Sequence, residues 1–258
     1  MYKQRWVVSA TLWVALMGAA VLPSTASALN DTCANAHVRP MGYQFSQVGN
    51  NTTRYYRFLA ASGASYHVHS SPVGTNDGAP EFCAVDNWLD ATCTTSAGAL
   101  YGDEDTNDGG SDGDGFIATS SGAHTTAILN SPEISAFNCE TIIQETTLFS
   151  PWFFREVANG YDGFVEIRNN HSDVVGGITV TAFASSGVAT GSTTIAIPGN
   201  GTALVRVSDL GAPATGFGSV RIATPQKPGT IVANITTLSG VTGLSFDAPF
   251  SRRESPYQ

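Results

Sequence analysis

The segment GFVEIRN, residues 163–169, alternates apolar and polar side chains, and this alternation decides the fold class. Val165 and Ile167 fall on one face of an extended chain, because successive side chains of a strand point to opposite sides. Phe164, Glu166 and Arg168 fall on the other face. A period of two with one apolar face is typical of a strand that covers a core on one side. Residues 163–169 are therefore predicted to form a half-buried β-strand.

Short segments of the same kind recur along the chain, separated by Gly, Pro, Asn and Asp. They cover residues 55–60, 65–70, 125–130, 141–149, 177–184, 193–197, 202–208, 219–223 and 231–238. A spacing of about ten residues between strands is typical of β-sandwiches. The sequence therefore predicts an all-β chain with two β-sandwich domains in series. The first is expected at residues 29–138 and the second, immunoglobulin-like, at 139–250, followed by a polar tail at 251–258.

Residues 1–28 have the parts of a secretory signal peptide. Lys3 and Arg5 precede an apolar run at 6–22, and an Ala-Ser-Ala site follows at 26–28. The alternative is an uncleaved anchor, because the run is near the lower length limit for a membrane span. Cleavage after Ala28 would leave 258 − 28 = 230 residues. We therefore expect a secreted protein, extracellular or periplasmic, with no membrane span in the mature chain.

The charge balance argues against two classes of partner. The whole chain has a net charge of −9, and loss of Lys3 and Arg5 with the signal would make it 10 − 21 = −11. Nucleic acids and anionic lipids are bound by positive surfaces. We therefore expect no nucleic-acid partner, and the sequence leaves the oligomeric state open.

Four cysteines, an even number, lie after residue 28: Cys33, Cys83, Cys93 and Cys139. In an exported protein this count predicts two disulfides, for which three pairings exist. A short loop closes at low entropic cost, which favours Cys83–Cys93 and leaves Cys33–Cys139 to join the two ends of one domain. The chain has no C-x-x-C motif, so a thioredoxin-like redox site has no support.

The first half resembles the bacterial pre-peptidase C-terminal domain, a small β-sandwich often appended to secreted peptidases. The resemblance is carried by RYYRF at 54–58, ASGASY at 61–66, Asp86, Leu89, the acidic turn at 103–105, and Ser121-Gly122 before the strand at 125–129. Residues 123–125, Ala-His-Thr, depart from the aromatic final strand of that family. The second half resembles an uncharacterised immunoglobulin-like domain of secreted bacterial proteins, through residues 145–148, 150–154, 165–169 and 240–247. No chemistry attaches to that second resemblance.

The stretch GDEDTNDGGSDGDG at 102–115 holds six acidic residues and five glycines. Calcium prefers several oxygen ligands, and glycines let backbone carbonyls turn inward. An EF-hand-like count places Asp103, Asp105 and Asn107 at positions one, three and five, and Asp114 at position twelve. Asp108 stands where an EF-hand has Gly, but the run is similar to thrombospondin type 3 calcium repeats. The predicted calcium ligands are Asp103, Asp105, Asn107, Asp108, Asp112 and Asp114, and the alternative is a solvated charged loop.

Sequence motifs of catalysis have little support. The chain has no H-E-x-x-H, and its one G-x-S-x-G match, at 109–113, lies inside the acidic glycine-rich stretch with no helix pattern after it, so the sequence predicts a non-catalytic protein. His67 and His69 share one side of a strand and could begin a zinc site, but ordinary strand histidines explain them as well.

Aromatic residues offer a second candidate site. Aromatic faces stack on the apolar faces of sugars, and the candidates are Trp88, Tyr101, Trp152, Phe153 and Phe154. The alternative is burial of residues 152–154 in a core or between domains.

The sequence therefore favours an exported non-catalytic binding or structural module that recognises protein or polysaccharide and is stabilised by calcium. The other expectation is an accessory domain pair of a secreted hydrolase system, or a cryptic hydrolase. An aromatic row exposed on one sheet would favour carbohydrate binding.

Overall fold

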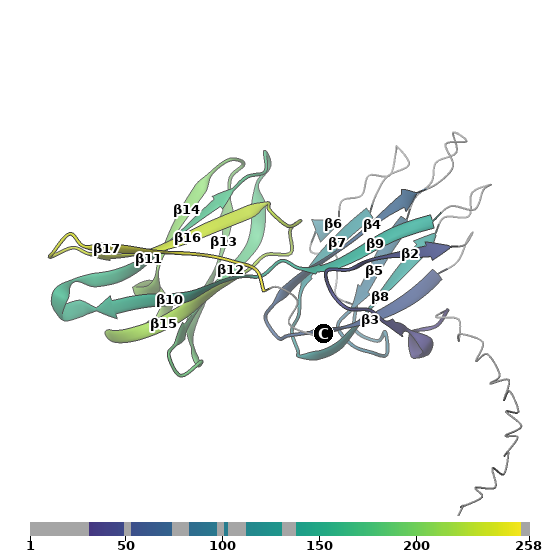
Figure 1. Cartoon of the computed structure of the whole chain (residues 1–258), viewed down its shortest axis with the longest axis horizontal. Coiled ribbons are helices and arrows are strands. Elements are labelled where there is room, and N and C mark those ends of the chain that lie inside the picture. The colour runs from purple at the N-terminus through teal and green to yellow at the C-terminus, as the bar shows by residue number, and fades with distance from the viewer. Residues whose placement is uncertain are drawn as a thin grey trace, which may run out of the picture.

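The computed structural model describes residues 31–48, 53–73, 83–96, 101–102, 112–130 and 138–253. These residues form β-strands and three 3-10 turns, η1 (Cys33–Asn35), η2 (Val157–Asn159) and η3 (Val207–Leu210). The predicted all-β fold is confirmed, and the strands build two units that follow one another along the long axis of Figure 1. We call residues 31–145 the first lobe and residues 148–253 the second lobe. No helix in the described part of the chain has the length and apolar character to cross a membrane.

The first lobe consists of two layers. One sheet has the order β1-β3-β8-β5 and the other the order β2-β9-β4-β7-β6. The strands of the first sheet are β1 (His37–Val38), β3 (Thr53–Ala60), β5 (Cys83–Trp88) and β8 (Gly122–Asn130). Those of the second are β2 (Gln44–Val48), β4 (Ser65–Val73), β6 (Tyr101–Gly102), β7 (Asp112–Ile117) and β9 (Asn138–Glu145). Phe58, Tyr66, Phe116, Ile128 and Ile143 fill the core between the layers.

The second lobe is a continuous sheet that folds over on itself. Its path is β13-β12-β15-β10-β11-β16-β17, and β14 pairs with β11. The strands are β10 (Leu148–Glu156), β11 (Tyr161–Asn169), β12 (Val175–Ala184), β13 (Ala189–Ile197), β14 (Thr202–Arg206), β15 (Thr215–Ala223), β16 (Ile231–Ser239) and β17 (Ser245–Pro249). Because β10 and β11 are paired only at Glu156 and Tyr161, the sheet separates into the layers β13-β12-β15-β10 and β14-β11-β16-β17.

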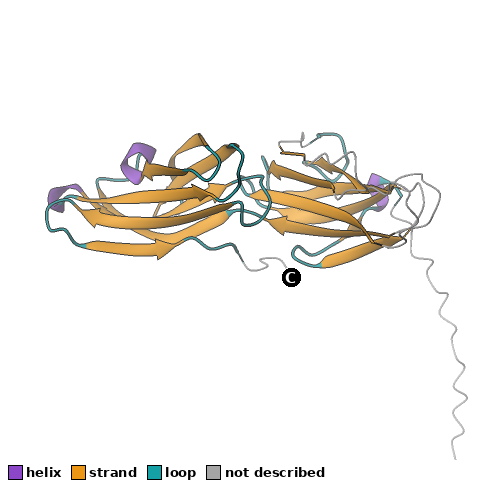
Figure 2. Ribbon diagram, turned by 90° about the horizontal axis from the view of Figure 1, so that it is seen from above, coloured by secondary structure: helices purple, strands orange, loops and turns teal. Residues whose placement is uncertain are grey.

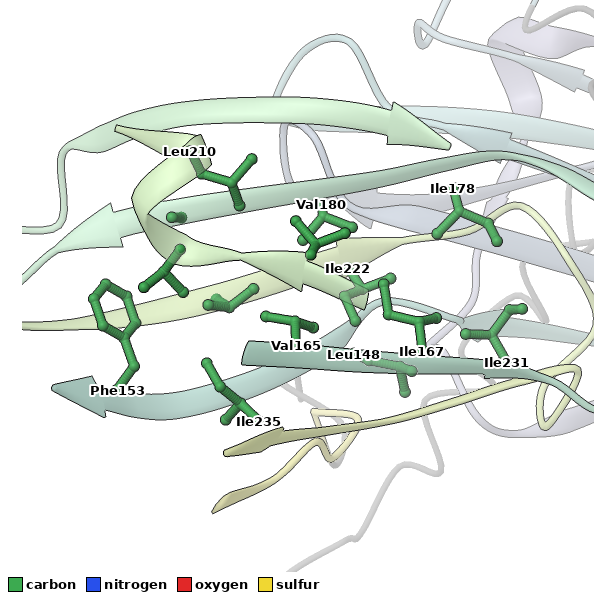
Figure 3. Packing of buried hydrophobic residues seen from close by; sticks show 14 of the residues in the cluster. Leu148, Phe153, Val165, Ile167, Ile178, Val180, Leu210, Ile222, Ile231 and Ile235 are labelled. Atoms are coloured by element: carbon green, nitrogen blue, oxygen red, sulfur yellow. The ribbon is translucent and has the colours of Figure 1, made fainter. Parts of the chain in front are cut away.

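The alternating apolar residues of the sequence fill the space between these two layers. Val165 and Ile167 of β11 face Val180 of β12 and Ile222 of β15, and all four are buried (Figure 3). Glu166 and Arg168 are exposed on the other side of β11, as the alternation predicts. The sandwich architecture therefore follows directly from the period of two in the sequence.

The expected boundary near Asn138 is wrong. Strand β9 begins at Asn138 and lies in the first lobe, between β2 and β4. The predicted single strand at 141–149 is broken after Glu145, where the chain crosses from one lobe to the other and β10 begins at Leu148. The second lobe therefore has eight strands of its own and does not include Cys139.

The favoured disulfide pairing is also wrong. The bonds join Cys33 to Cys93 and Cys83 to Cys139. Strand β5 runs from Cys83 to Trp88, and a strand rises about 3.3 Å per residue, so it carries Cys93 out of reach of Cys83. Cys83 instead faces Cys139 of β9 across the core, and this disulfide links the two sheets of the first lobe.

The two lobes are joined by buried hydroxyl groups. The Thr224 N–H donates to Ser65 Oγ at 2.9 Å, and the Ser65 N–H donates to Thr147 Oγ1 at 2.8 Å. Thr146 also donates to Ser65 Oγ at 3.0 Å. Gly115 of β7 lies so close to the Pro225 carbonyl that a Cβ there would overlap it. The lobes therefore pack directly on each other, as the two views in Figures 1 and 2 both show.

The C-terminal segment returns to this junction. Ser251 pairs with Phe149 through the backbone, and Arg253 Nη2 lies 2.9 Å from Glu145 Oε1. Residues 251–253 of the expected polar tail are therefore held in place, and residues 254–258 lie outside the described residues, as do 1–28.

Candidate functional site

Five aromatic rings from four strands gather on the second lobe. Trp152 and Phe154 come from β10, Tyr161 from β11, Phe217 from β15 and Phe246 from β17. The closest ring centroids are those of Phe154 and Phe217, 5.2 Å apart, and of Phe154 and Tyr161, 5.5 Å apart. Trp152 lies 6.2 Å from Phe217 and from Phe246, and Tyr161 lies 6.4 Å from Phe246. We call these five residues the aromatic cluster.

Strand alternation places part of this cluster on the outer face of the β13-β12-β15-β10 layer. Phe154 and Phe217 are cross-strand partners, and their neighbours Phe153 and Gly218 face the core. A Cβ at Gly218 would overlap the Phe153 ring, so the glycine makes room for that ring in the core. Because adjacent residues of a strand alternate, the rings of Phe154 and Phe217 point away from the core.

A β-bulge decides which aromatic residue of β10 is buried. The register with β15 shifts between Ser150 and Phe153. Ser150 and Phe153 both face inward, which strict alternation over three positions would not allow. The inserted residue is accommodated at Pro151 and Trp152, and a bulge tolerates the missing N–H of proline. Of the two alternatives for Phe153, a sugar platform or burial, burial is confirmed, because Phe153 is 1% exposed in the core.

The cluster is partly open to solvent, and the turns that follow β10 and β16 carry further exposed apolar residues. Phe217 is 53% exposed and Phe246 is 47% exposed. Val157 in the β10–β11 turn and Val241 and Leu244 in the β16–β17 turn are exposed as well. A Cβ at Gly160 would meet Val241, so the two turns lie side by side. Exposed apolar groups that gather on one region are candidates for an interaction site.

The polar groups beside the cluster are engaged within the lobe. Arg155 donates to the Ala212 carbonyl and pairs with Asp162, with 3.7 Å between Nε and Oδ1. Asp162 also accepts from the Gly163 N–H at 2.9 Å and from Ser208 Oγ at 2.6 Å. The arrangement therefore offers a ligand aromatic surface, with the Arg155–Asp162 pair already satisfied.

The remaining aromatic candidates lie elsewhere. Trp88 is on β5 of the first lobe, with its ring 6.0 Å from that of Tyr55. Tyr101 belongs to β6, where its backbone pairs with Gly115 of β7. Neither strand is part of the second lobe, so only Trp152 and Phe154 of the predicted platform come together.

Three members of the cluster, Tyr161, Phe217 and Phe246, are not among the aromatic residues that the sequence singled out. Phe217 extends an alternation that includes Ser219 and Arg221 on one face and Val220 and Ile222 on the other. That signal was present in the sequence. Tyr161 and Phe246 gave no comparable signal, because their places depend on how β11 and β17 meet β10.

The acidic stretch connects two antiparallel strands. Asp103, Asp105, Asn107 and Asp108 lie outside the described residues. Asp112 and Asp114 belong to β7, which pairs with β6 before the stretch, so the stretch joins the strands of a hairpin. Asp114 is buried between the sheets and accepts from Asn87 Nδ2 at 2.8 Å. Calcium binding by these residues stays a prediction.

The two strand histidines are stacked. The rings of His67 and His69 lie 6.3 Å apart with an angle of 16° between them, on one side of β4 as predicted. Across the part of the chain that the structure describes, no three His, Cys, Asp or Glu side chains form a group that could hold a metal.

Comparisons with known proteins give little support to any family. No protein family model matches the chain, and no curated protein matches it. The chain is similar to a β-glucuronidase of Parabacteroides merdae with 11% identity and a TM-score of 0.21, over 85% of this chain and 29% of that one. It is similar to a β-glucuronidase of glycoside hydrolase family 2 with 9% identity and a TM-score of 0.17, over 86% of this chain and 25% of that one.

The chain therefore spans less than a third of the length of those two enzymes, and TM-scores this low carry no functional argument. The resemblance of the first half to the pre-peptidase C-terminal domain stays a prediction.

Proposed function

We propose that this chain is an exported, non-catalytic binding module that recognises polysaccharide through the aromatic cluster. The observation that carries the proposal is the gathering of five rings on one region of the second lobe, with Phe217 and Phe246 about half exposed. The C–H faces of a sugar are apolar and pack on aromatic faces, which supply a large contact area at little conformational cost.

The compartment supports the same proposal. Two disulfides fit an oxidising environment outside the cytoplasm. Polysaccharides are abundant there, and a rigid β-sandwich holds its aromatic side chains in place before the ligand arrives. Pre-organisation of this kind reduces the entropic cost of binding.

A hydrolase has weaker support. His171 Nδ1 lies 3.5 Å from Asp173 Oδ2, which brings a histidine to a carboxylate. Their side chains are 44% and 81% exposed and lie two residues apart in one turn. A catalytic dyad is usually held in a water-excluding cleft by a third group, which makes this pair a poor candidate.

The proposal is tested by affinity electrophoresis of the purified protein through gels that contain single polysaccharides. Phe217→Ala is expected to weaken retention by roughly tenfold, the equivalent of about 1.4 kcal/mol of lost binding energy. Leu204→Ala is the matched control, because Leu204 is 62% exposed on β14 in the other layer. Equal retention of the two variants, or no retention of the wild type in any gel, would refute the proposal.

A further inference from the structure

An acidic side chain lies at the distal end of the aromatic cluster. Glu156 is two residues beyond Phe154 on the same face of β10, and its cross-strand partner on β11 is Tyr161. Its Oε2 accepts from Asn159 Nδ2 at 2.7 Å in the turn that follows. This hydrogen bond orients the carboxylate of a residue that follows Phe154 on one face of β10 and is paired with Tyr161.

No counter-charge on the same layer is free to balance it. Arg155 is directed to the Ala212 carbonyl and to Asp162. Arg221, on the outer face of β15, donates from Nη1 to the Ser62 carbonyl at 3.1 Å and lies over the Phe183 ring, 5.2 Å from its centroid. Between Phe217 and Arg221 the outward residue of β15 is Ser219, which is uncharged.

The charge of Asp247 does not alter this arrangement. Asp247 follows Phe246 on β17, and adjacent residues of a strand face opposite sides. Its Oδ1 accepts from Thr236 Oγ1 at 2.6 Å on β16. Glu156 therefore carries the carboxylate that shares the outer face of β10 with Phe154 and would face a ligand there.

We infer that the aromatic cluster takes neutral polysaccharide and that Glu156 is a specificity-determining residue that excludes anionic polymers. The inference rests on the proposed function and names its ligand class. A polymer with carboxylates along its length brings negative charge close to Glu156, with no free cation on this layer to compensate. The net charge of −9 for the whole chain acts in the same direction at longer range.

The test compares polygalacturonate with its carboxyl-reduced form, which keeps the backbone linkage and loses the charge. The wild-type protein is expected to bind the reduced polymer and to bind polygalacturonate at least tenfold more weakly in 20 mM NaCl. Glu156→Gln, which keeps a side-chain acceptor for Asn159, is expected to strengthen binding of polygalacturonate about threefold, as one removed charge repulsion predicts. In 500 mM NaCl this gain should fall towards unity, because exposed charges are screened.

Glu166→Gln is the matched control, because Glu166 is exposed on β11 in the other layer. Equal binding of both polymers by the wild type, or an equal gain from both substitutions, would overturn the inference while the proposed function stands. If the wild type binds neither the reduced polymer nor another neutral polysaccharide such as xylan or curdlan, the proposed function fails and the inference fails with it.

Discussion

His124 is buried inside the core of the first lobe, although no sequence motif surrounds it. Its ring lies 6.0 Å from the rings of Phe58 and Phe116 and is nearly parallel to that of Phe116. Burial lowers the pKa of His124 below its ordinary value, and the Gly122 carbonyl and the charge of Asp90 oppose this only in part. The folded protein therefore holds this imidazole in its neutral form.

The neutral state of His124 predicts a pH dependence of stability. The unfolded chain takes up a proton below about pH 6.5, and the folded chain resists it, so stability should fall as pH drops through that value. His124→Phe, which keeps an aromatic ring in the core, should make the melting temperature change less between pH 7.5 and 5.5. His171→Gln, at an exposed histidine, serves as the control. An unchanged slope in the His124 variant would contradict the neutral assignment.

Asp90 organises the turn that holds Cys93. Its carboxylate accepts from Thr92 Oγ1 at 2.7 Å and from the backbone N–H groups of Thr92, Thr94 and Thr95. The hydrogen bond from the Thr92 hydroxyl, followed by those from the backbone, holds the pKa of Asp90 well below its usual range. Hydrogen bonds to this one carboxylate therefore hold the turn between β5 and Cys93, where the backbone N–H groups have no strand partner.

At the scale of single elements, the alternation of side chains predicted the strands at 163–169 and 177–184, which lie within β11 and β12. It could not predict the bulge at 151–152 or the crossing at 146–147. Both features depend on what packs against the strand. The crossing at 146–147 does not interrupt the run of β-forming residues, and Pro151 interrupts the run without showing which neighbouring residue turns inward. Since a shift of one residue exchanges the two faces of a strand, the bulge alone decides that Phe153 is buried and Phe154 is not.

The two disulfides are expected to contribute differently to the stability of the first lobe. Their sequence separations, 60 for Cys33–Cys93 and 56 for Cys83–Cys139, imply similar restriction of the unfolded chain, about 4 kcal/mol each. Cys83 and Cys139 are also fully buried between the sheets, whereas Cys33 and Cys93 are half-buried. Replacing Cys83 and Cys139 by alanine should therefore lower the melting temperature more than replacing Cys33 and Cys93, because a core cavity adds to the loss. A larger loss from the second pair would contradict this order.

At the scale of the whole molecule, the junction between the lobes fixes one end of the second lobe and leaves the other end free. Ser65, Thr146, Thr147 and Thr224 are buried at the junction. The β10–β11 turn, with Glu156 at its start and Tyr161 at its end, lies at the far end of the molecule in Figure 1. Under the proposed function, the aromatic cluster would therefore lie at the end of the second lobe that the first lobe does not cover, where a long polymer has access.

The central claim, that the aromatic cluster contacts a neutral polysaccharide, is tested most directly by the fluorescence of Trp152. The chain has four tryptophans, and replacing Trp6, Trp13 and Trp88 by phenylalanine leaves Trp152 alone. Titration with the neutral polysaccharide that the wild type retains should shift the emission of Trp152 to shorter wavelength and reach saturation, since a stacked sugar removes water from the ring. Retention of the polymer with unchanged Trp152 emission would contradict the claim.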